Sequence, residues 1–272
     1  MCGIAGVAAR LSRERLASTV QAMTDAIAHR GPDDEGAWIG EGFGFGMRRL
    51  SIIDLAGGHQ PMWDSRSGLR IVYNGEVYNY KAIRAELEKS GLAFRTASDT
   101  EVVLQSLAMK GSRAVHDWNG MFAVAAWYER EKKLLLIRDR LGVKPLYYYW
   151  DGAVLMFASE IKAFLNSPLF TRRLNPLAVW DFLTYRYVPG PHTMWQNVWK
   201  LPPGHLLEWS PGSQPRVSQY WQTDVLSVDE PVNIDQKTRE FEDLFLDSVS
   251  QRLLASDVPV GVMLSGGLDS SA

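Results

Sequence analysis

The chain has 272 residues, of which 46% are hydrophobic and 22% charged, with a formal net charge of −2. This balance is typical of a globular protein and excludes a disordered chain, and the weak charge argues against a nucleic-acid partner. The apolar stretches are too short to span a bilayer and the start of the chain lacks a basic signal-peptide region, so we expect a cytoplasmic protein without a membrane partner. The single cysteine, Cys2, excludes an internal disulfide.

The first two-thirds of the chain predict short helices and strands in an irregular order. Residues 16–29 have helical spacing and end at Gly31 and Pro32. Strands are expected at 44–53 and 69–73, and the second runs into Asn74-Gly75, a dipeptide that favours a turn because both residues tolerate positive φ. The later elements are helices at 80–90 and 100–110 and strands at 122–127, 134–137, 146–150 and 154–158. This order predicts an α+β domain with antiparallel sheets.

The last third changes character. Prolines interrupt the chain after residue 188, and residues 222–235 have the composition of a linker. An amphipathic helix is expected at 237–254, followed by a buried strand at 258–264. That strand leads into a run of small and polar residues, Ser265, Gly266, Gly267, Leu268, Asp269, Ser270 and Ser271.

Cys2 is a candidate nucleophile because removal of Met1 before a small residue would leave it at the chain start. Its α-amine would then have a pKa of roughly 7.7–8.0, suited to a general base for its own thiol. A terminal amine that activates its own residue is an alternative to a Cys–His pair.

The motifs that follow Cys2 carry a family resemblance. They are Met1-Cys2-Gly3-Ile4-Ala5-Gly6, His29-Arg30-Gly31-Pro32-Asp33, Arg49-Leu50-Ser51-Ile52-Ile53-Asp54, Tyr73-Asn74-Gly75-Glu76-Val77-Tyr78-Asn79 and Ser98-Asp99-Thr100-Glu101. In this order they resemble the glutaminase domain of class II glutamine amidotransferases, which are N-terminal-nucleophile hydrolases, and most of all the glutamine-hydrolysing asparagine synthetases. The resemblance covers essentially the whole chain. It implies a four-layer αββα sandwich.

The resemblance also implies a site and a reaction. Cys2 attacks the side-chain amide of glutamine and forms a thioester, while the Asn74 amide and the Gly75 N–H, aimed by the expected turn, hold the oxyanion. Arg49 binds the α-carboxylate of glutamine, and Asp99, assisted by Glu76, binds its α-ammonium. We expect His29 and Arg30 only to order a loop, and we expect no metal in this domain. The expected glutamine-binding residues are Arg49, Leu50, Ser51, Ile52, Ile53, Asn74, Gly75, Glu76 and Asp99.

The run from Ser265 to Ser271 resembles the pyrophosphate-binding loop of ATP pyrophosphatases, in which backbone N–H groups surround phosphate oxygens. The resemblance implies ATP binding by these seven residues, with ATP and Mg²⁺ as requirements of the complete synthetase. Because the sequence stops at Ala272, we expect this chain to retain at most the glutaminase half. The expected domains are a glutaminase domain at 1–210, a linker at 211–235 and the start of an α/β ATP-binding domain at 236–272.

The expected function is therefore that of a glutamine-dependent asparagine synthetase, whose ammonia amidates aspartate at the expense of ATP. Three related amidotransferases, glucosamine-phosphate synthase, amidophosphoribosyltransferase and glutamate synthase, share the terminal cysteine but do not activate a carboxylate with ATP. A family member acting on a saccharide or a natural product remains an alternative, as does a non-enzymatic remnant. The resemblance leaves open a homodimer or association with a separate synthetase half.

Overall fold

The computed structural model describes residues 1–223, 233–261 and 263–271. The strands are β1 (Gly3–Ala8), β2 (Asp34–Ile39), β3 (Phe43–Arg49), β4 (Met62–Asp64), β5 (Leu69–Val77), β6 (Gly120–Tyr128), β7 (Lys133–Arg138), β8 (Tyr147–Trp150), β9 (Leu155–Ala158), β10 (Val198–Lys200), β11 (His205–Trp209) and β12 (Arg216–Gln219). The helices are α1 (Arg13–Asp25), α2 (Tyr80–Lys89), α3 (Asp99–Lys110), α4 (Lys162–Leu165), α5 (Pro176–Tyr185), α6 (Ile234–Leu254) and α7 (Leu268–Ser271), with 3-10 turns η1 (Ala28–Arg30) and η2 (Gly111–Asp117).

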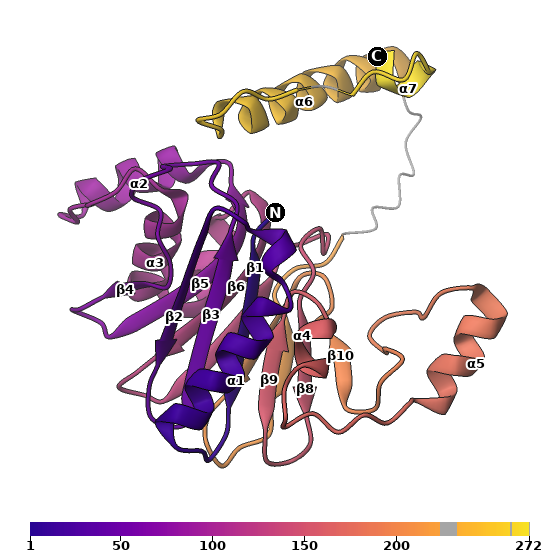
Figure 1. The fold of residues 1–272 in the computed structure, drawn as a ribbon. Coiled ribbons are helices and arrows are strands. Elements are labelled where there is room, and N and C mark those ends of the chain that lie inside the picture. Colours follow the sequence, from indigo (N-terminus) through magenta and orange to yellow (C-terminus); the bar gives the residue numbers. More distant parts are fainter. Residues whose placement is uncertain (224–232, 262, 272) are drawn as a thin grey trace.

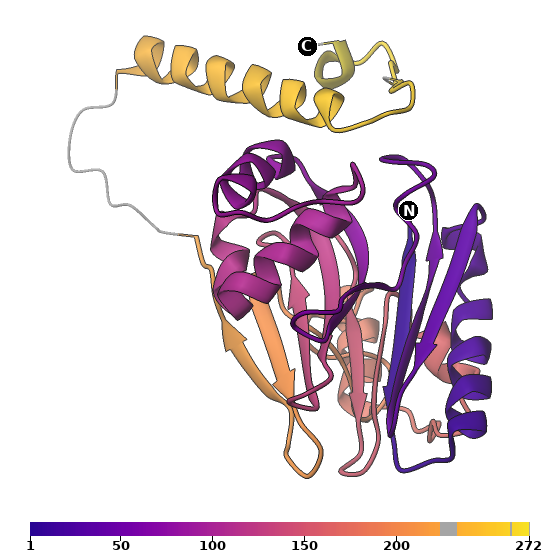
Figure 2. The same cartoon turned by 90° about the vertical axis from the view of Figure 1, so that its left-hand side faces the viewer.

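The strands form two antiparallel sheets that face each other (Figures 1 and 2). The first has the order β10-β8-β9-β1-β3-β2, and the second has the order β12-β11-β7-β6-β5-β4. Helices α1 and α4 lie against the first sheet, and α3 lies against the second with α2 beside it. The predicted α+β fold with four layers is therefore confirmed.

Three apolar clusters hold the layers together, one between each pair. Leu16 and Val20 of α1 pack against the first sheet. Phe43 of the first sheet stacks on Trp127 of the second, with ring centroids 4.2 Å apart. Leu104 of α3 packs against the outer face of the second sheet. Alternation along the strands sends side chains to both faces, which is why each sheet contributes to two clusters.

The Asn74-Gly75 turn is the prediction that the structure most clearly overturns. Both residues lie inside β5 and pair with Ala123 and Phe122 of β6. A Cβ on Gly75 would lie 2.2 Å from the carbonyl oxygen of Met121. Glycine is therefore required here because β6 approaches closely, and not because the chain turns.

Other boundaries also differ from the predictions. β3 ends at Arg49, so residues 50–53 form a loop. β10, β11 and β12 fall in the region expected to be irregular, and β12, which follows the expected boundary at residue 210, still belongs to the second sheet. Residues 224–232 of the expected linker lie outside the described residues.

The strand expected at 258–264 is absent from the described residues of that segment, where Val260 and Leu264 are exposed. A strand is stabilised by hydrogen bonds to a neighbour, and none of the described strands pairs with this segment. The preceding helix is present as α6, which begins after its N-cap Asn233. None of the described helices combines the length and apolar character needed to cross a membrane.

Candidate active site

Cys2 directly precedes β1, which lies between β9 and β3 in the first sheet. Its Sγ accepts a hydrogen bond from the Leu50 N–H (3.4 Å) and lies 3.6 Å from the Leu50 carbonyl oxygen, to which the thiol donates. Arg30 donates from Nε to the Cys2 carbonyl (2.9 Å) and from Nη1 to Glu160 (3.0 Å). Arg30 therefore anchors the backbone of the candidate nucleophile, a more direct role than the loop ordering expected from the sequence.

Asn74 comes from the opposite sheet and lines the same cavity as Cys2. Its side chain is buried, with 1% exposed, and its Nδ2 has no hydrogen-bond acceptor among the described residues. Buried amides nearly always have a partner, so an unpaired donor at a cavity wall needs an explanation. Its position suits a ligand oxygen that the cavity would receive.

Arg49 ends β3 and is 5% exposed. Its guanidinium donates to three carbonyls of the following loop, those of Ile53 (2.9 Å), Asp54 (2.8 Å) and Leu55 (3.2 Å). Arg49 thus shapes the loop that borders the cavity, and its remaining N–H groups are the ones left for a ligand carboxylate.

Asp99 is the first residue of α3, with Ser98 as the N-cap. Its buried carboxylate accepts hydrogen bonds from the Tyr73 hydroxyl (2.8 Å) and the Val77 N–H (3.2 Å). Burial raises the pKa of Asp99 to about 6, although these hydrogen bonds favour the charged form. The site therefore contains a carboxylate whose charge is lost in a mildly acidic solution.

This titration predicts the acid limb of any activity that needs a negative Asp99. If Asp99 binds the α-ammonium of glutamine, kcat/KM for glutamine should fall as the pH is lowered through about 6, because protonation removes the charge. Asp99→Asn should lower kcat/KM by about 30-fold or more, since truncating one partner of a buried charge pair costs about 2–5 kcal/mol. Asp117→Asn, at an exposed ion pair with Lys110, is the control. A variant that keeps the wild-type value at neutral pH would contradict this role.

The Cys2 cavity has a volume of about 320 Å³, within the range of small-ligand sites. Of the expected catalytic and glutamine-binding residues, it brings together Cys2, Arg49, Leu50, Ile52, Ile53, Asn74, Gly75, Glu76 and Asp99. Ser51 is not part of the wall, because its N–H donates to the Asp33 carboxylate (2.9 Å). Gln60, Tyr73 and Lys144 also line the cavity and were not predicted. Among the described residues, no group of three or more His, Cys, Asp or Glu side chains could hold a metal ion.

Two of these additional residues support the walls. Gln60 accepts a hydrogen bond from the Tyr73 N–H (2.6 Å) and donates to Thr100 (3.3 Å), so it joins β5 to the start of α3. Tyr73 in turn orients Asp99. The Gln60 side chain, in the loop before β4, carries no local sequence signal, because its partners depend on how the chain folds.

Lys144 places a positive charge in the wall of the same cavity. It is 5% exposed, and its backbone is held by hydrogen bonds to Asp139 (2.9 Å) and from Arg138 (2.9 Å). Burial raises the pKa of the Cys2 thiol, and the charge of Lys144 opposes this rise. Burial lowers the pKa of Lys144 itself, which nearby Glu76 counteracts.

Lys144→Met should therefore shift the pH profile of Cys2 alkylation by iodoacetamide to higher pH, because the thiolate loses a stabilising charge. At neutral pH we expect roughly threefold slower alkylation, since a nearby charge in a high effective dielectric contributes about 0.5–1 kcal/mol. Lys132→Met, at an exposed pair with Glu41, should leave the profile unchanged. Identical profiles for Lys144→Met and wild type would show that this charge does not act on Cys2.

The segment after α6 contacts the loop beside the Cys2 cavity. The Asp257 carboxylate accepts a hydrogen bond from the Asp54 N–H (2.8 Å), and the Asp257 N–H donates to the Ile52 carbonyl (3.1 Å). The Arg252 guanidinium lies 4.6 Å from the centre of the Tyr78 ring. Asp257, just after α6, therefore contacts the loop that contributes Ile52 to the wall of the candidate site.

The expected nucleotide loop is held by its own serines. The Ser265 and Ser270 hydroxyls lie 2.9 Å apart, and the Ser265 N–H donates to Ser270 Oγ (3.1 Å). Gly266 has a φ of 74°, which favours glycine, and α7 follows directly. Ser265, Gly266, Gly267 and Leu268 are exposed. ATP binding by this loop stays a prediction.

The fold and the cavity agree with the comparisons to known proteins. The family described as glutamine amidotransferase domain matches residues 1–221, and the family described as asparagine synthase matches residues 240–272. The chain belongs to the glutamine amidotransferase family. Among solved structures, glutamine phosphoribosylpyrophosphate amidotransferase from Bacillus subtilis has a TM-score of 0.61 at 17% identity, covering 82% of this chain and 50% of that one, and this likeness shows the fold.

Particular relatives are named asparagine synthetases. The chain is 39% identical to asparagine synthetase (glutamine-hydrolyzing) 2 of Bacillus subtilis, covering 100% of this chain and 38% of that protein. It is 37% identical to a putative asparagine synthetase (glutamine-hydrolyzing) 2 of Methanocaldococcus jannaschii, covering 100% of this chain and 56% of that protein. The chain thus spans between about four-tenths and just over half of the length of these relatives.

Proposed function

We propose that this domain hydrolyses glutamine to glutamate and ammonia, with Cys2 as the nucleophile after removal of Met1. The observation that carries the proposal is that Cys2 and the Asn74 amide, whose Nδ2 has no partner among the described residues, line one cavity from opposite sheets. A nucleophile and an oxyanion donor on one cavity wall are the two groups that acyl transfer needs first.

In the first step the α-amine of Cys2 takes the thiol proton, and the sulfur attacks the side-chain carbonyl carbon of glutamine. Asn74 Nδ2 and the Gly75 N–H stabilise the negative oxygen of the tetrahedral intermediate. The intermediate collapses to a thioester as the C–N bond breaks, and the amine returns its proton to the departing ammonia. Water, deprotonated by the same amine, then attacks the thioester and releases glutamate and the thiol.

The amino-acid end of glutamine would be fixed by charge. Arg49 binds the α-carboxylate, and Asp99 with Glu76 binds the α-ammonium. Burial raises the pKa of Glu76 as it raises that of Asp99. A bound ammonium group would therefore stabilise the charged form of both acids. An amide without these end groups would lack the anchors that orient it toward Cys2.

The experiment is to measure glutamate released from glutamine by the purified chain without ATP, together with the intact mass. Glutamate release by protein that has lost Met1 is the expected result. A chain that has lost Met1, keeps its fold and releases no glutamate would refute the proposal for this polypeptide. Protein that retains Met1 should be inactive, because its Cys2 amine is blocked in a peptide bond.

For the complete protein we propose an asparagine synthetase, in which ammonia amidates aspartate with ATP and Mg²⁺. The support is the asparagine synthase match at residues 240–272 and the names of the relatives. We propose a glutaminase domain that begins at residue 1 and, because β12 belongs to its second sheet, continues past the expected boundary at residue 210, followed by a linker up to 235 and the start of the ATP-binding part at 236–272. Transfer to another carboxylate remains the second candidate, because the acceptor site is not part of the glutaminase cavity. A homodimer, a separate synthetase half and a cytoplasmic location stay predictions.

A further inference from the structure

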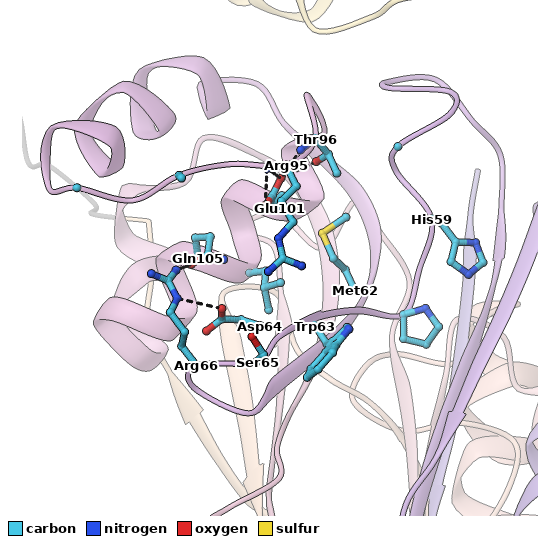
Figure 3. Close-up of a pocket in the computed structure, with 15 residues that line it drawn as sticks. His59, Met62, Trp63, Asp64, Ser65, Arg66, Arg95, Thr96, Glu101 and Gln105 are labelled. Carbon is cyan, nitrogen blue, oxygen red and sulfur yellow. Dashed lines mark hydrogen bonds and ion pairs between the residues drawn. The ribbon is translucent and has the colours of Figure 1, made fainter.

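A second and larger cavity, the Trp63 cavity, lies on the other side of the wall that carries Gln60 and Asp99. It has a volume of about 500 Å³ and lies between β4, the segment before α3, and α3 itself. Figure 3 shows Arg95 descending from the segment before α3 toward Met62 and Trp63, with Arg66 and Gln105 on one side and His59 on the other. The glutaminase mechanism uses none of these side chains.

The two acids of the Trp63 cavity are already engaged. Glu101 accepts hydrogen bonds from the Arg95 N–H (3.0 Å), the Thr96 N–H (2.7 Å) and the Thr96 hydroxyl (2.8 Å). Asp64 accepts from the Ser67 N–H (2.9 Å) and the Ser67 hydroxyl (2.7 Å), and pairs with Arg66 (3.4 Å). Both acids are also buried, Glu101 being 5% and Asp64 6% exposed, so little of either carboxylate can reach a cation or the ammonium of an amino acid in the cavity.

By contrast, two hydrogen-bond donors and an aromatic ring of the Trp63 cavity are available to a ligand. The Arg95 guanidinium makes no hydrogen bond or ion pair with any described residue. Gln105 is 6% exposed and accepts from Arg66 Nη2 (3.2 Å), but its amide nitrogen has no acceptor among the described residues. The Trp63 ring is 49% exposed and is held by Arg70, whose guanidinium lies 4.6 Å from its centre. An aromatic surface thus shares a cavity with a cation and an amide donor that have no partner among the residues the structure describes.

We propose that the Trp63 cavity binds a small aromatic carboxylate. The ring of such a ligand would pack on Trp63 and Met62, and its carboxylate would receive the N–H groups of Arg95 and the amide of Gln105. An amino acid fits less well, because its ammonium would find both acids already occupied. The ligand chemistry is therefore a planar monoanion without an amine.

The position of the Trp63 cavity couples it to the Cys2 cavity. Gln60 lines the Cys2 cavity, while its neighbours His59 and Pro61 line the Trp63 cavity. Likewise Asp99 lines the first, while Glu101 lines the second. A ligand that shifts either segment acts on the walls of both cavities, and the coupling is reciprocal. This coupling rests on the proposed glutaminase function, whereas binding itself does not.

Binding is tested by calorimetric titration of the full chain with naphthoate as the probe. Naphthamide, which has the ring without the charge, and acetate, which has the charge without an aromatic ring, should both bind more weakly. Arg95→Gln should weaken naphthoate binding by about 10- to 100-fold, the value of a lost charged hydrogen-bonding pair. Trp63→Leu should weaken it by roughly 3- to 10-fold through lost ring packing. Arg10→Gln, at an exposed arginine outside the cavity wall, is the control and should bind as wild type does.

Arg95→Gln keeps the backbone N–H that donates a hydrogen bond to Glu101, so we expect the variant to fold. Thermal unfolding checks this. No binding of naphthoate at millimolar concentrations overturns the proposal, as does binding that both cavity variants leave unchanged. For the coupling, naphthoate should change the KM for glutamine in wild type and not in Arg95→Gln. Binding without any change in KM overturns the coupling alone. A chain that releases no glutamate counts against the proposed function and leaves the binding comparison intact.

Discussion

Cys2→Ala is expected to abolish glutamate release while the protein stays folded. The thiol of Cys2 is the only one in the chain, so no other sulfur can replace it as a nucleophile. Removing the nucleophile of a comparable acyl-transfer enzyme costs on the order of 10⁶ in kcat. In the part of the chain that the structure describes, the hydrogen bonds of the thiol are the two long ones to Leu50, so the free energy of unfolding should change by no more than about 1 kcal/mol.

The measurement is glutamate release at saturating glutamine, with thermal unfolding followed on the same preparation. Cys2→Ser serves as a graded partner, because it keeps a weaker nucleophile at the same atom position. Ser90→Ala, at an exposed hydroxyl at the end of α2, is the control for a small substitution away from the site. A Cys2→Ala protein that still releases glutamate at a substantial rate would show that Cys2 is not the nucleophile, because this variant cannot form a thioester.

Asn74→Ala has the second largest expected effect, a 10²- to 10³-fold fall in kcat with little change in KM. Its amide nitrogen is buried and unpaired among the described residues, so it is free to donate to an oxygen that becomes negative during the reaction. Losing one oxyanion donor raises the barrier by about 2.7–4 kcal/mol. KM should change little because this bond strengthens only in the transition state.

The alkylation rate of Cys2 separates this role from a structural one. Because Asn74 Nδ2 makes no hydrogen bond within the described chain, Asn74→Ala breaks none there, and the alkylation rate of Cys2 should stay that of wild type. Asn166→Ala removes an exposed amide that donates to Lys162 (3.0 Å) and should leave kcat unchanged. An Asn74→Ala protein with an unaltered kcat, or with Cys2 alkylation lowered to the same extent as kcat, would exclude the oxyanion role.

Much of the candidate site could be predicted because its motifs are contiguous in the sequence. Cys2, Arg49, Asn74 and Asp99 each lie in a short motif whose residue types suit a step of acyl transfer. The structure brings all four to one cavity. No role at this site could be predicted for Lys144 or Gln60 from the sequence. Their place in the cavity depends on packing between segments far apart in the chain.

Local periodicity was sufficient for the elements with their own apolar pattern and insufficient where a partner decides the conformation. The helical spacing of α1 and the apolar runs of β6 and β7 are visible in sequence, because their buried faces repeat at the helix or strand period. Asn74-Gly75 has the composition of a turn, yet nine residue pairs with β6 hold it in a strand. Conversely, the apolar run at 258–264 has the composition of a strand but no described neighbour to pair with.

The sequence by itself determined the α+β class, the place of the candidate nucleophile directly after Met1 and the charges suited to the ends of an amino acid. These follow from residue types and short spacings, which need no knowledge of the fold. Only the tertiary structure decided that Asn74 faces Cys2 from the other sheet, that Arg30 fixes the Cys2 backbone, and that the Trp63 cavity adjoins the first. Such contacts join residues far apart in the chain, and their geometry is set by how sheets and helices pack as layers.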